Sequence, residues 1–225
     1  DFFLTERIDE IKPISVFVNG EKVAENGKIL KRSPHVIPEK VEGAVRIKDL
    51  SLSLFSLPLT SDRARVIRIL PGGVVTAKDE AVVKRDERGE WVHEKDKDIL
   101  KITVIERHNN TGYHASALIS GYGLKHGAIA STIAHDSHNI IVIGDNDDDM
   151  LLAVKSLKEK GGGITLVMDN KELSYHRLEI AGLMTDESVE SVVECLDELH
   201  RVVEEEMGGV NREMDPFMTL CFMAL

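Results

Sequence analysis

Four short apolar segments follow one another between residues 98 and 144, and they constrain the fold more than any other feature of the sequence. They read DILKITVIERH (98–108), HASALISGYG (114–123), GAIASTIA (127–134) and NIIVIG (139–144). Each has the length of a strand and is rich in β-branched or small side chains. Continuous apolar strands are typical of sheets that are covered on both faces. We therefore predict that these segments are strands buried on both faces.

Turn and alternation signals predict further strands on either side of this region. Asn19-Gly20 separates two apolar stretches within residues 11–30, and this dipeptide favours a tight hairpin because both central turn positions need a positive φ. Asn26-Gly27 predicts a second turn. The other predicted strands are a short edge strand within 50–59, a half-buried strand at 63–70 that resumes after 73, a hairpin around Arg88-Gly89 with Trp91 on its return strand, and a strand, turn and strand at 164–173.

Three segments carry helix signals. A cap at Asp145 or Asn146 and a run of acids precede apolar positions at helical spacing, and glycine ends this pattern at residue 161. A longer periodic pattern covers about 186–207, and Asp215-Pro216 predicts the start of a short last helix. Strands thus come first and are then mixed with helices. We predict an α+β fold, a mainly antiparallel or mixed sheet with a few flanking helices.

The amino-terminal part is predicted to be a separate unit. Residues 31–45 contain Pro34 and Pro38 and few apolar side chains, which is typical of a linker. We predict a first domain at 1–45, which holds a small β-sandwich element and this linker, and an α+β domain at 46–225. The chain begins with Asp and ends on the apolar run PFMTLCFMAL, whereas natural termini are usually polar. This pattern favours an excerpt of a longer protein.

Composition disfavours several classes of protein. A net charge of −11 argues against nucleic-acid binding and against anionic membrane surfaces, because both require clustered Lys and Arg. The sequence holds no apolar run near the roughly 20 residues of a spanning helix, and no signal-peptide pattern. Its two cysteines, Cys195 and Cys221, are expected to be free thiols of a cytoplasmic protein.

The stretch AHDSHN, residues 134–139, is the first candidate site. Its five consecutive polar side chains lie between two apolar segments. An imidazole beside a carboxylate suits general acid–base chemistry, because the carboxylate fixes the ring tautomer and raises the ring's basicity. Two histidines three residues apart would also suit a metal, with Asp136 as a further ligand. The remaining alternative is a polar turn whose side chains satisfy the backbone between buried strands.

VIERHNNTG, residues 104–112, is the second candidate. Arg107 and His108 come at the end of a predicted strand, and a flexible polar turn follows them. Loops beyond strand ends commonly carry ligand-binding groups, although a solvated strand end explains the pattern equally well.

Both candidates fall within a longer resemblance to a known family. VIERHNNTG, SGYGLKHGAIASTIAHDSHNIIVIGDNDDDM, GGGITLVMDNKE, IAGLMTDE and DPFMTL resemble consecutive blocks of the carboxy-terminal region of adenine deaminases of the amidohydrolase superfamily. The resemblance is strong over residues 98–225 and weaker over 11–70, where VFVNGEKVAENGKIL looks like strands that complete the small β-sandwich of an amidohydrolase.

The resemblance implies hydrolysis of adenine to hypoxanthine and ammonia, part of adenine catabolism, by water activated on a divalent metal. It implies that the metal (manganese, iron or zinc) is bound mainly by a (β/α)8 barrel upstream of this chain. The barrel's His-x-His and other ligand blocks do not occur in this sequence, so we expect the chain to be inactive alone. On this basis we assign catalytic roles to His135, Asp136 and His138, substrate-binding roles to Ser137, Asn139, Arg107 and His108, and metal-binding roles to none.

The expected partners are adenine, the barrel in cis or in trans, and further copies of the chain in a homo-oligomer. Two alternatives stay open. The segment is a structural or oligomerisation module whose polar loop is buried and satisfied, or it is a freestanding metal-binding domain that uses His135 and His138. The second alternative needs further ligands, for which only Asp136, His108, His114 and His126 lie near enough in sequence.

Overall fold

The structure, a computed structural model, describes residues 1–32, 41, 43, 45–70, 72 and 74–224. The chain divides into two compact units, Asp1–Pro38 and Glu39–Leu225. The predicted linker prolines, Pro34 and Pro38, lie outside the described residues. The domain boundary after residue 45 remains a prediction, because most residues from 33 to 44 also lie outside them.

The first unit is a four-stranded antiparallel sheet in the order β1-β2-β3-β4. Its strands are β1 (Phe2–Thr5), β2 (Pro13–Val18), β3 (Glu21–Glu25) and β4 (Lys28–Ile29). Asn19 and Gly20 have φ values of 51° and 77°, and Asn26 and Gly27 have 50° and 76°, which confirms both predicted turns. The sheet fits the predicted small β element as a single layer. Its large apolar side chains are mostly exposed: Phe2, Phe3, Leu4, Ile8, Ile11, Val18, Ile29 and Leu30.

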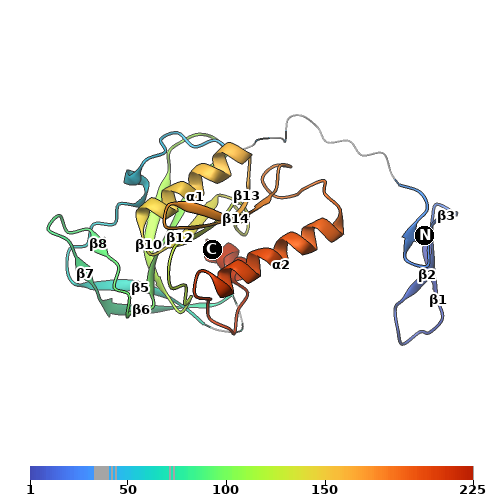
Figure 1. Cartoon of the computed structure of the whole chain (residues 1–225), viewed down its shortest axis with the longest axis horizontal. Coiled ribbons are helices and arrows are strands. Elements are labelled where there is room, and N and C mark those ends of the chain that lie inside the picture. Colours follow the sequence, from blue (N-terminus) through green and yellow to red (C-terminus); the bar gives the residue numbers. More distant parts are fainter. Residues whose placement is uncertain (33–40, 42, 44, 71, 73, 225) are drawn as a thin grey trace. The chain divides into compact units, whose positions relative to one another are not determined.

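The second unit is built on an eight-stranded sheet (Figure 1). Its order is β14-β13-β11-β12-β9-β10-β5-β6, and every neighbouring pair is antiparallel except β10 and β5. The strands are β5 (Arg63–Ile69), β6 (Thr76–Val82), β9 (Ile99–Ile105), β10 (His114–Ser120), β11 (Ala128–Ser131), β12 (Ile140–Gly144), β13 (Gly163–Met168) and β14 (Lys171–Arg177). A two-stranded hairpin, β7 (Lys84–Arg85) and β8 (Trp91–Val92), lies beside it.

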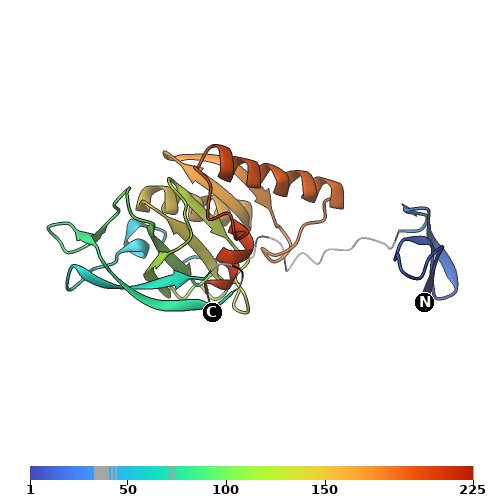
Figure 2. The same cartoon turned by 90° about the horizontal axis from the view of Figure 1, so that it is seen from below.

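Helices cover both faces of this sheet (Figures 1 and 2). Helix α1 (Asp147–Lys160) packs its Met150, Ala153 and Val154 against Ala128, Ala130 and Val142 on one face. On the other face, α2 (Val189–Glu205) and α3 (Pro216–Phe222) pack against alternate residues of the same strands, including Ile129 and Ile141. All residues of β11 and β12 are buried, and so are all residues of β9 except the half-buried Val104. This confirms strands covered on both sides for three of the four predicted segments, and it confirms the α+β fold class. For the fourth segment the prediction is wrong in part, because His114 and Ala115 at the start of β10 are exposed.

The helix caps follow the sequence signals closely. The side chain of Asn146 accepts a hydrogen bond from the Asp149 N–H, and Gly161 ends α1 at φ 85°. Ser188 caps α2, and Asp215 caps α3 ahead of Pro216. Both cysteines are free. Among the described residues, no helix combines the length and apolarity needed to cross a membrane.

One predicted element is wrong. The expected edge strand within 50–59 is a 3₁₀ helix, η2 (Leu52–Phe55), followed by an isolated bridge between Pro58 and Glu90. Leu54 and Phe55 are consecutive and both buried. A strand would point these two side chains to opposite faces, whereas a helical turn directs both into the core beneath it.

Candidate functional site

The two loops that the sequence singles out lie side by side at one end of the central strands of the large sheet. Residues 132–139 join β11 to β12, and residues 106–113 join β9 to β10. In the sheet register, Ile105 pairs with Ile140 on one side and with His114 on the other. The end of β9 therefore stands between the two loops and brings them together.

The outer part of the 132–139 loop presents three polar side chains to solvent: His135, Asp136 and Ser137. His135 Nδ1 lies 3.4 Å from Asp136 Oδ1. The His135 ring stacks on the Phe222 ring of α3, with centroids 4.7 Å apart. The main-chain N–H of His135 donates to the Cys221 carbonyl at 2.7 Å. Helix α3 therefore holds one face of this imidazole while its edge remains open.

In the inner part of the loop, some polar side-chain atoms lack a hydrogen-bond partner among the described residues. His138 and Asn139 are half-buried, and the atoms His138 Nδ1 and Asn139 Oδ1 are enclosed without a hydrogen-bond partner among the described residues. Leaving such an atom unpaired costs about 1–3 kcal/mol. Asp136 and His138 also have positive φ values of 65° and 46°, which are uncommon for residues other than glycine. The loop thus differs from a polar turn whose groups are all paired internally.

Glu106 fixes the neighbouring loop. Its carboxylate accepts main-chain N–H groups from His108, Asn109 and Thr111, and also the Thr111 hydroxyl. Burial by itself would raise the pKa of Glu106, but these donors outweigh it and lower the pKa to about 2. The turn so formed places His108 Nε2 at 2.8 Å from the Ser137 carbonyl. His108 is thereby in contact with the 132–139 loop.

Arg107 lies beneath the loops rather than on their surface. Only 1% of this residue is exposed. Its Nε donates to the His138 carbonyl at 2.5 Å, and its Nη2 donates to the Ala181 carbonyl at 3.0 Å and to the Thr132 carbonyl at 3.3 Å. Burial lowers the pKa of its guanidinium. The structure therefore brings Arg107 to the predicted site with its donors directed at the main chain.

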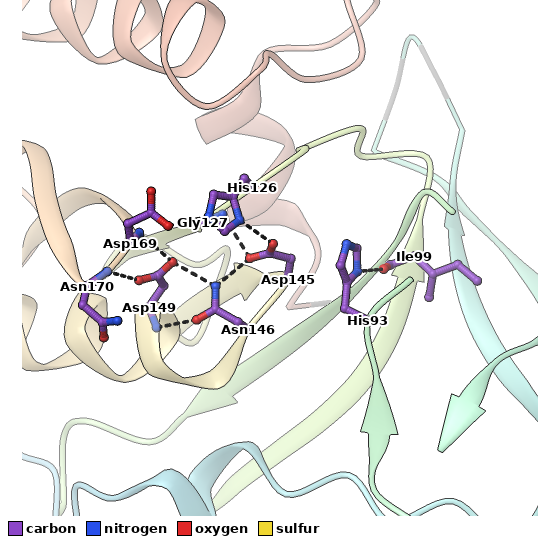
Figure 3. A network of polar contacts seen from close by, with 9 residues as sticks. All are labelled: His93, Ile99, His126, Gly127, Asp145, Asn146, Asp149, Asp169 and Asn170. Carbon is purple, nitrogen blue, oxygen red and sulfur yellow. Dashed lines mark hydrogen bonds and ion pairs between the residues drawn. The ribbon is translucent and has the colours of Figure 1, made fainter. Parts of the chain in front are cut away.

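A second polar cluster lies at the opposite ends of the central strands, before β11 and after β12 (Figure 3). It was not predicted from the sequence. His126 Nδ1 is 2.7 Å from Asp145 Oδ2, and His126 Nε2 is 2.8 Å from Asp169 Oδ1. Asp145 also accepts the Gly127 N–H and the Asn146 amide. The hydrogen bond to Asp145 is the main cause, and that to Asp169 the next, of a raised His126 pKa. Both ring nitrogens donate only when the imidazole is protonated, so this bridge requires the charged form.

Stability is expected to depend on pH through this bridge. The pKa of His126 in the folded chain lies above its ordinary value of 6.5. The bridge therefore contributes fully below pH 6.5, and its contribution is lost as pH rises through the higher folded value. We expect an effect below about 1 kcal/mol, because the half-exposed pair is screened by solvent. Urea unfolding of the wild type and His126→Gln between pH 5.5 and 8.5 measures this contribution. If the free energy of unfolding depends on pH equally in the two proteins, the bridge does not contribute as expected.

The structure does not assemble a metal centre from these groups. Among the residues that it describes, no three His, Cys, Asp or Glu side chains are placed to hold one metal ion. A freestanding metal site on His135 and His138 therefore lacks its further ligands in this part of the chain.

Two hollows of the second unit are formed by other residues than the loops, and the smaller one adjoins the 132–139 loop through Phe222, which stacks on His135. A hollow of about 1040 Å³ is formed by β5, β6, β10 and residues 57–61, and one of about 240 Å³ lies beside Met214 and Phe222. Neither is lined by residues 106–108 or 132–139. The loops are a stronger candidate site than the larger hollow, because they hold the paired imidazole and carboxylate of His135 and Asp136.

Comparison with known proteins places the chain in a family. A sequence model of the adenine deaminase C-terminal domain matches residues 73–225. The chain is 45% identical to adenine deaminase 2 of Carboxydothermus hydrogenoformans, 41% to adenine deaminase 2 of Desulfotalea psychrophila and 40% to adenine deaminase of Ligilactobacillus salivarius. Each match covers 100% of this chain and 39% of the relative, so the chain spans about two fifths of their length. The chain belongs to the adenine deaminase family, and its residues 73–225 are the family's carboxy-terminal domain.

Proposed function

We propose that this chain is the carboxy-terminal part of an enzyme that hydrolyses adenine to hypoxanthine and ammonia, and that the 132–139 loop helps to bind or enclose the purine. The complete enzyme, here the parent enzyme, would supply a metal-bearing barrel in cis or in trans as the other wall of the site. The names of the relatives support the reaction. The observation that carries the role of the loop is its exposed His135–Asp136 pair. Beside this pair, His138 and Asn139 each hold an enclosed atom that has no hydrogen-bond partner in the described part of the chain.

The chemistry of adenine suits these side chains. Its ring nitrogens accept hydrogen bonds, and its amino group and ring N–H donate them. An imidazole can donate to a ring nitrogen, and a carboxylate can accept from the amino group. Because the amino nitrogen leaves as ammonia, it must gain one proton during the reaction, which the attacking water gives up. His135 beside Asp136 is the arrangement that delivers a proton near neutral pH, and Ser137, His138, Asn139 and His108 would orient the ring.

We propose that the divalent metal of the parent enzyme is bound outside this chain. The described residues contain no fitting set of ligands, so we derive no step through it. We accordingly expect the purified 225-residue chain to be inactive, and deamination by this chain alone would overturn that expectation.

A structural role for the first unit is compatible with this proposal. Its single sheet exposes large apolar side chains such as Phe2, Phe3 and Ile29, and exposed apolar side chains that gather in one region commonly mark an interaction surface. We propose that this sheet packs on the rest of the parent enzyme, as part of a β-sandwich or between copies in a homo-oligomer.

The first test is His135→Ala in the parent enzyme. We expect kcat/KM for adenine to fall by about 10²- to 10⁴-fold, because one hydrogen-bonding and proton-transferring group is lost. His200→Ala is the matched control. His200 is 43% exposed against 44% for His135, it pairs with Asp215, and it contacts the ring of Phe217. Equal kinetics of wild type and His135→Ala would remove the loop from the site.

A further inference from the structure

We propose that Arg107 is a positioning residue that holds three surface loops in one rigid platform and does not itself touch the purine. The loops are residues 106–113, 132–139 and 180–184. The first two carry the proposed site residues, so the catalytic meaning of this inference rests on the proposed function. The platform itself can be measured without activity.

The contacts of Arg107 span all three loops. The residue belongs to the first loop, and its main-chain carbonyl accepts the Arg46 N–H at 2.9 Å. Its guanidinium donates to Thr132 and His138, near the two ends of the second loop. It also donates to Ala181 in the third loop. One side chain therefore joins loops that are 25 to 74 residues away from it in sequence.

The geometry at Arg107 requires a guanidinium. Carbonyl groups of His138, Thr132 and Ala181, from two different loops, accept hydrogen bonds from this one side chain, and only the rigid fork of Arg offers donors in several fixed directions. The position of Gly182 leaves room for the guanidinium only because glycine has no side chain: a Cβ there would lie 2.9 Å from Arg107 Nη1. The Thr132 hydroxyl donates to the Gly182 carbonyl at 2.6 Å and so ties the second and third loops together beside the guanidinium.

Arg107 controls the part of the loop that carries the exposed pair. Asp136 and His138 adopt left-handed conformations that are unfavourable for these residues and persist only when surrounding contacts hold them. The Arg107 hydrogen bond to the His138 carbonyl is one such contact. Without it, the backbone between Thr132 and His138 is free to relax, and the side chains of His135 and Asp136 change direction.

Hydrogen exchange of the 225-residue chain tests the platform. Arg107→Lys keeps the charge but loses the fork, so we expect amide exchange in 132–139 and 180–184 to become faster by about tenfold or more, with little change in hairpin 84–92. Lys101→Met is the matched control. Lys101 is also a buried cation, 2% exposed, and it donates to the Phe55 carbonyl and to Asp147, away from the three loops. Unchanged exchange in both loops of Arg107→Lys would overturn the inference.

Kinetics of the same variants in the parent enzyme separate positioning from contact. We expect Arg107→Lys to lower kcat about tenfold or more with a smaller change in KM, and Lys101→Met to leave both unchanged at equal folded fraction. A raised KM with unchanged loop exchange would mean that Arg107 contacts the substrate, and would overturn the inference. Faster loop exchange with unchanged kinetics would overturn the proposed function and leave the platform standing.

Discussion

Changing His135 to Ala and Asp136 to Asn together is expected to lower kcat for adenine deamination by about 10²- to 10⁴-fold in the parent enzyme, the range typical of a lost acid–base group. The two residues are consecutive and their polar atoms are 3.4 Å apart. In the proposed site Asp136 orients the ring of His135, so the role of the aspartate passes through the histidine.

This dependence predicts non-additive effects. Once His135 is absent, Asp136 has no ring to orient, and the double variant should be little slower than the slower single variant. A separation of 3.4 Å is loose for a hydrogen bond between charged groups, but catalytic hydrogen bonds commonly tighten only with substrate bound. The tightening is expected to appear in kcat more than in KM.

Steady-state kinetics of wild type, both single variants and the double variant measure this coupling. The matched control is the His200→Ala and Asp215→Asn cycle, since that pair is also surface-exposed and close, with His200 Nε2 at 2.6 Å from Asp215 Oδ2. Asn keeps a side-chain oxygen to cap α3. Losses in the 135–136 cycle no larger than those in the control cycle would show that the first pair has no catalytic role.

Local features of the fold could be predicted from the sequence because their causes are local. The turn at Asn19-Gly20 needs positive φ at consecutive positions, and the start of α1 needs a side-chain acceptor such as Asn146. Both causes lie within a few residues of the effect. The sequence does not predict the η2 helix, because Leu54 and Phe55 are buried by packing against distant segments, which overrides the loose alternation within residues 50–59.

The sites show the limit of the same reasoning. AHDSHN and Arg107–His108 were found by their density of polar groups beside apolar strands. Their contact depends on the register of Ile105 with Ile140, which a local pattern does not contain. The second cluster joins His126 to residues 19 and 43 positions later in the chain. In sequence these acids read as helix caps and turn residues.

Asp145→Ala is expected to lower the free energy of unfolding by about 3 kcal/mol, the second large effect that the structure predicts. The Asp145 carboxylate is the centre of the cluster in Figure 3. It accepts hydrogen bonds from His126 Nδ1 at 2.7 Å, from the Gly127 N–H at 3.0 Å and from the Asn146 side-chain amide at 2.7 Å. Its removal leaves the buried Gly127 N–H without this acceptor and releases the turn before β11 from the end of β12.

Asp169→Ala is the matched control, because it removes the other carboxylate on the same imidazole. The two side chains lie at similar distances from His126, but 74% of the Asp169 side chain is exposed against 7% for Asp145. Exposed pairs contribute little, so we expect a loss below about 1 kcal/mol. Urea unfolding at pH 6, where the imidazole is charged, compares the two variants. Equal losses would mean that burial of Asp145 does not set the strength of the cluster, and that the bridge to the turn at Asp169 holds this edge of the sheet instead.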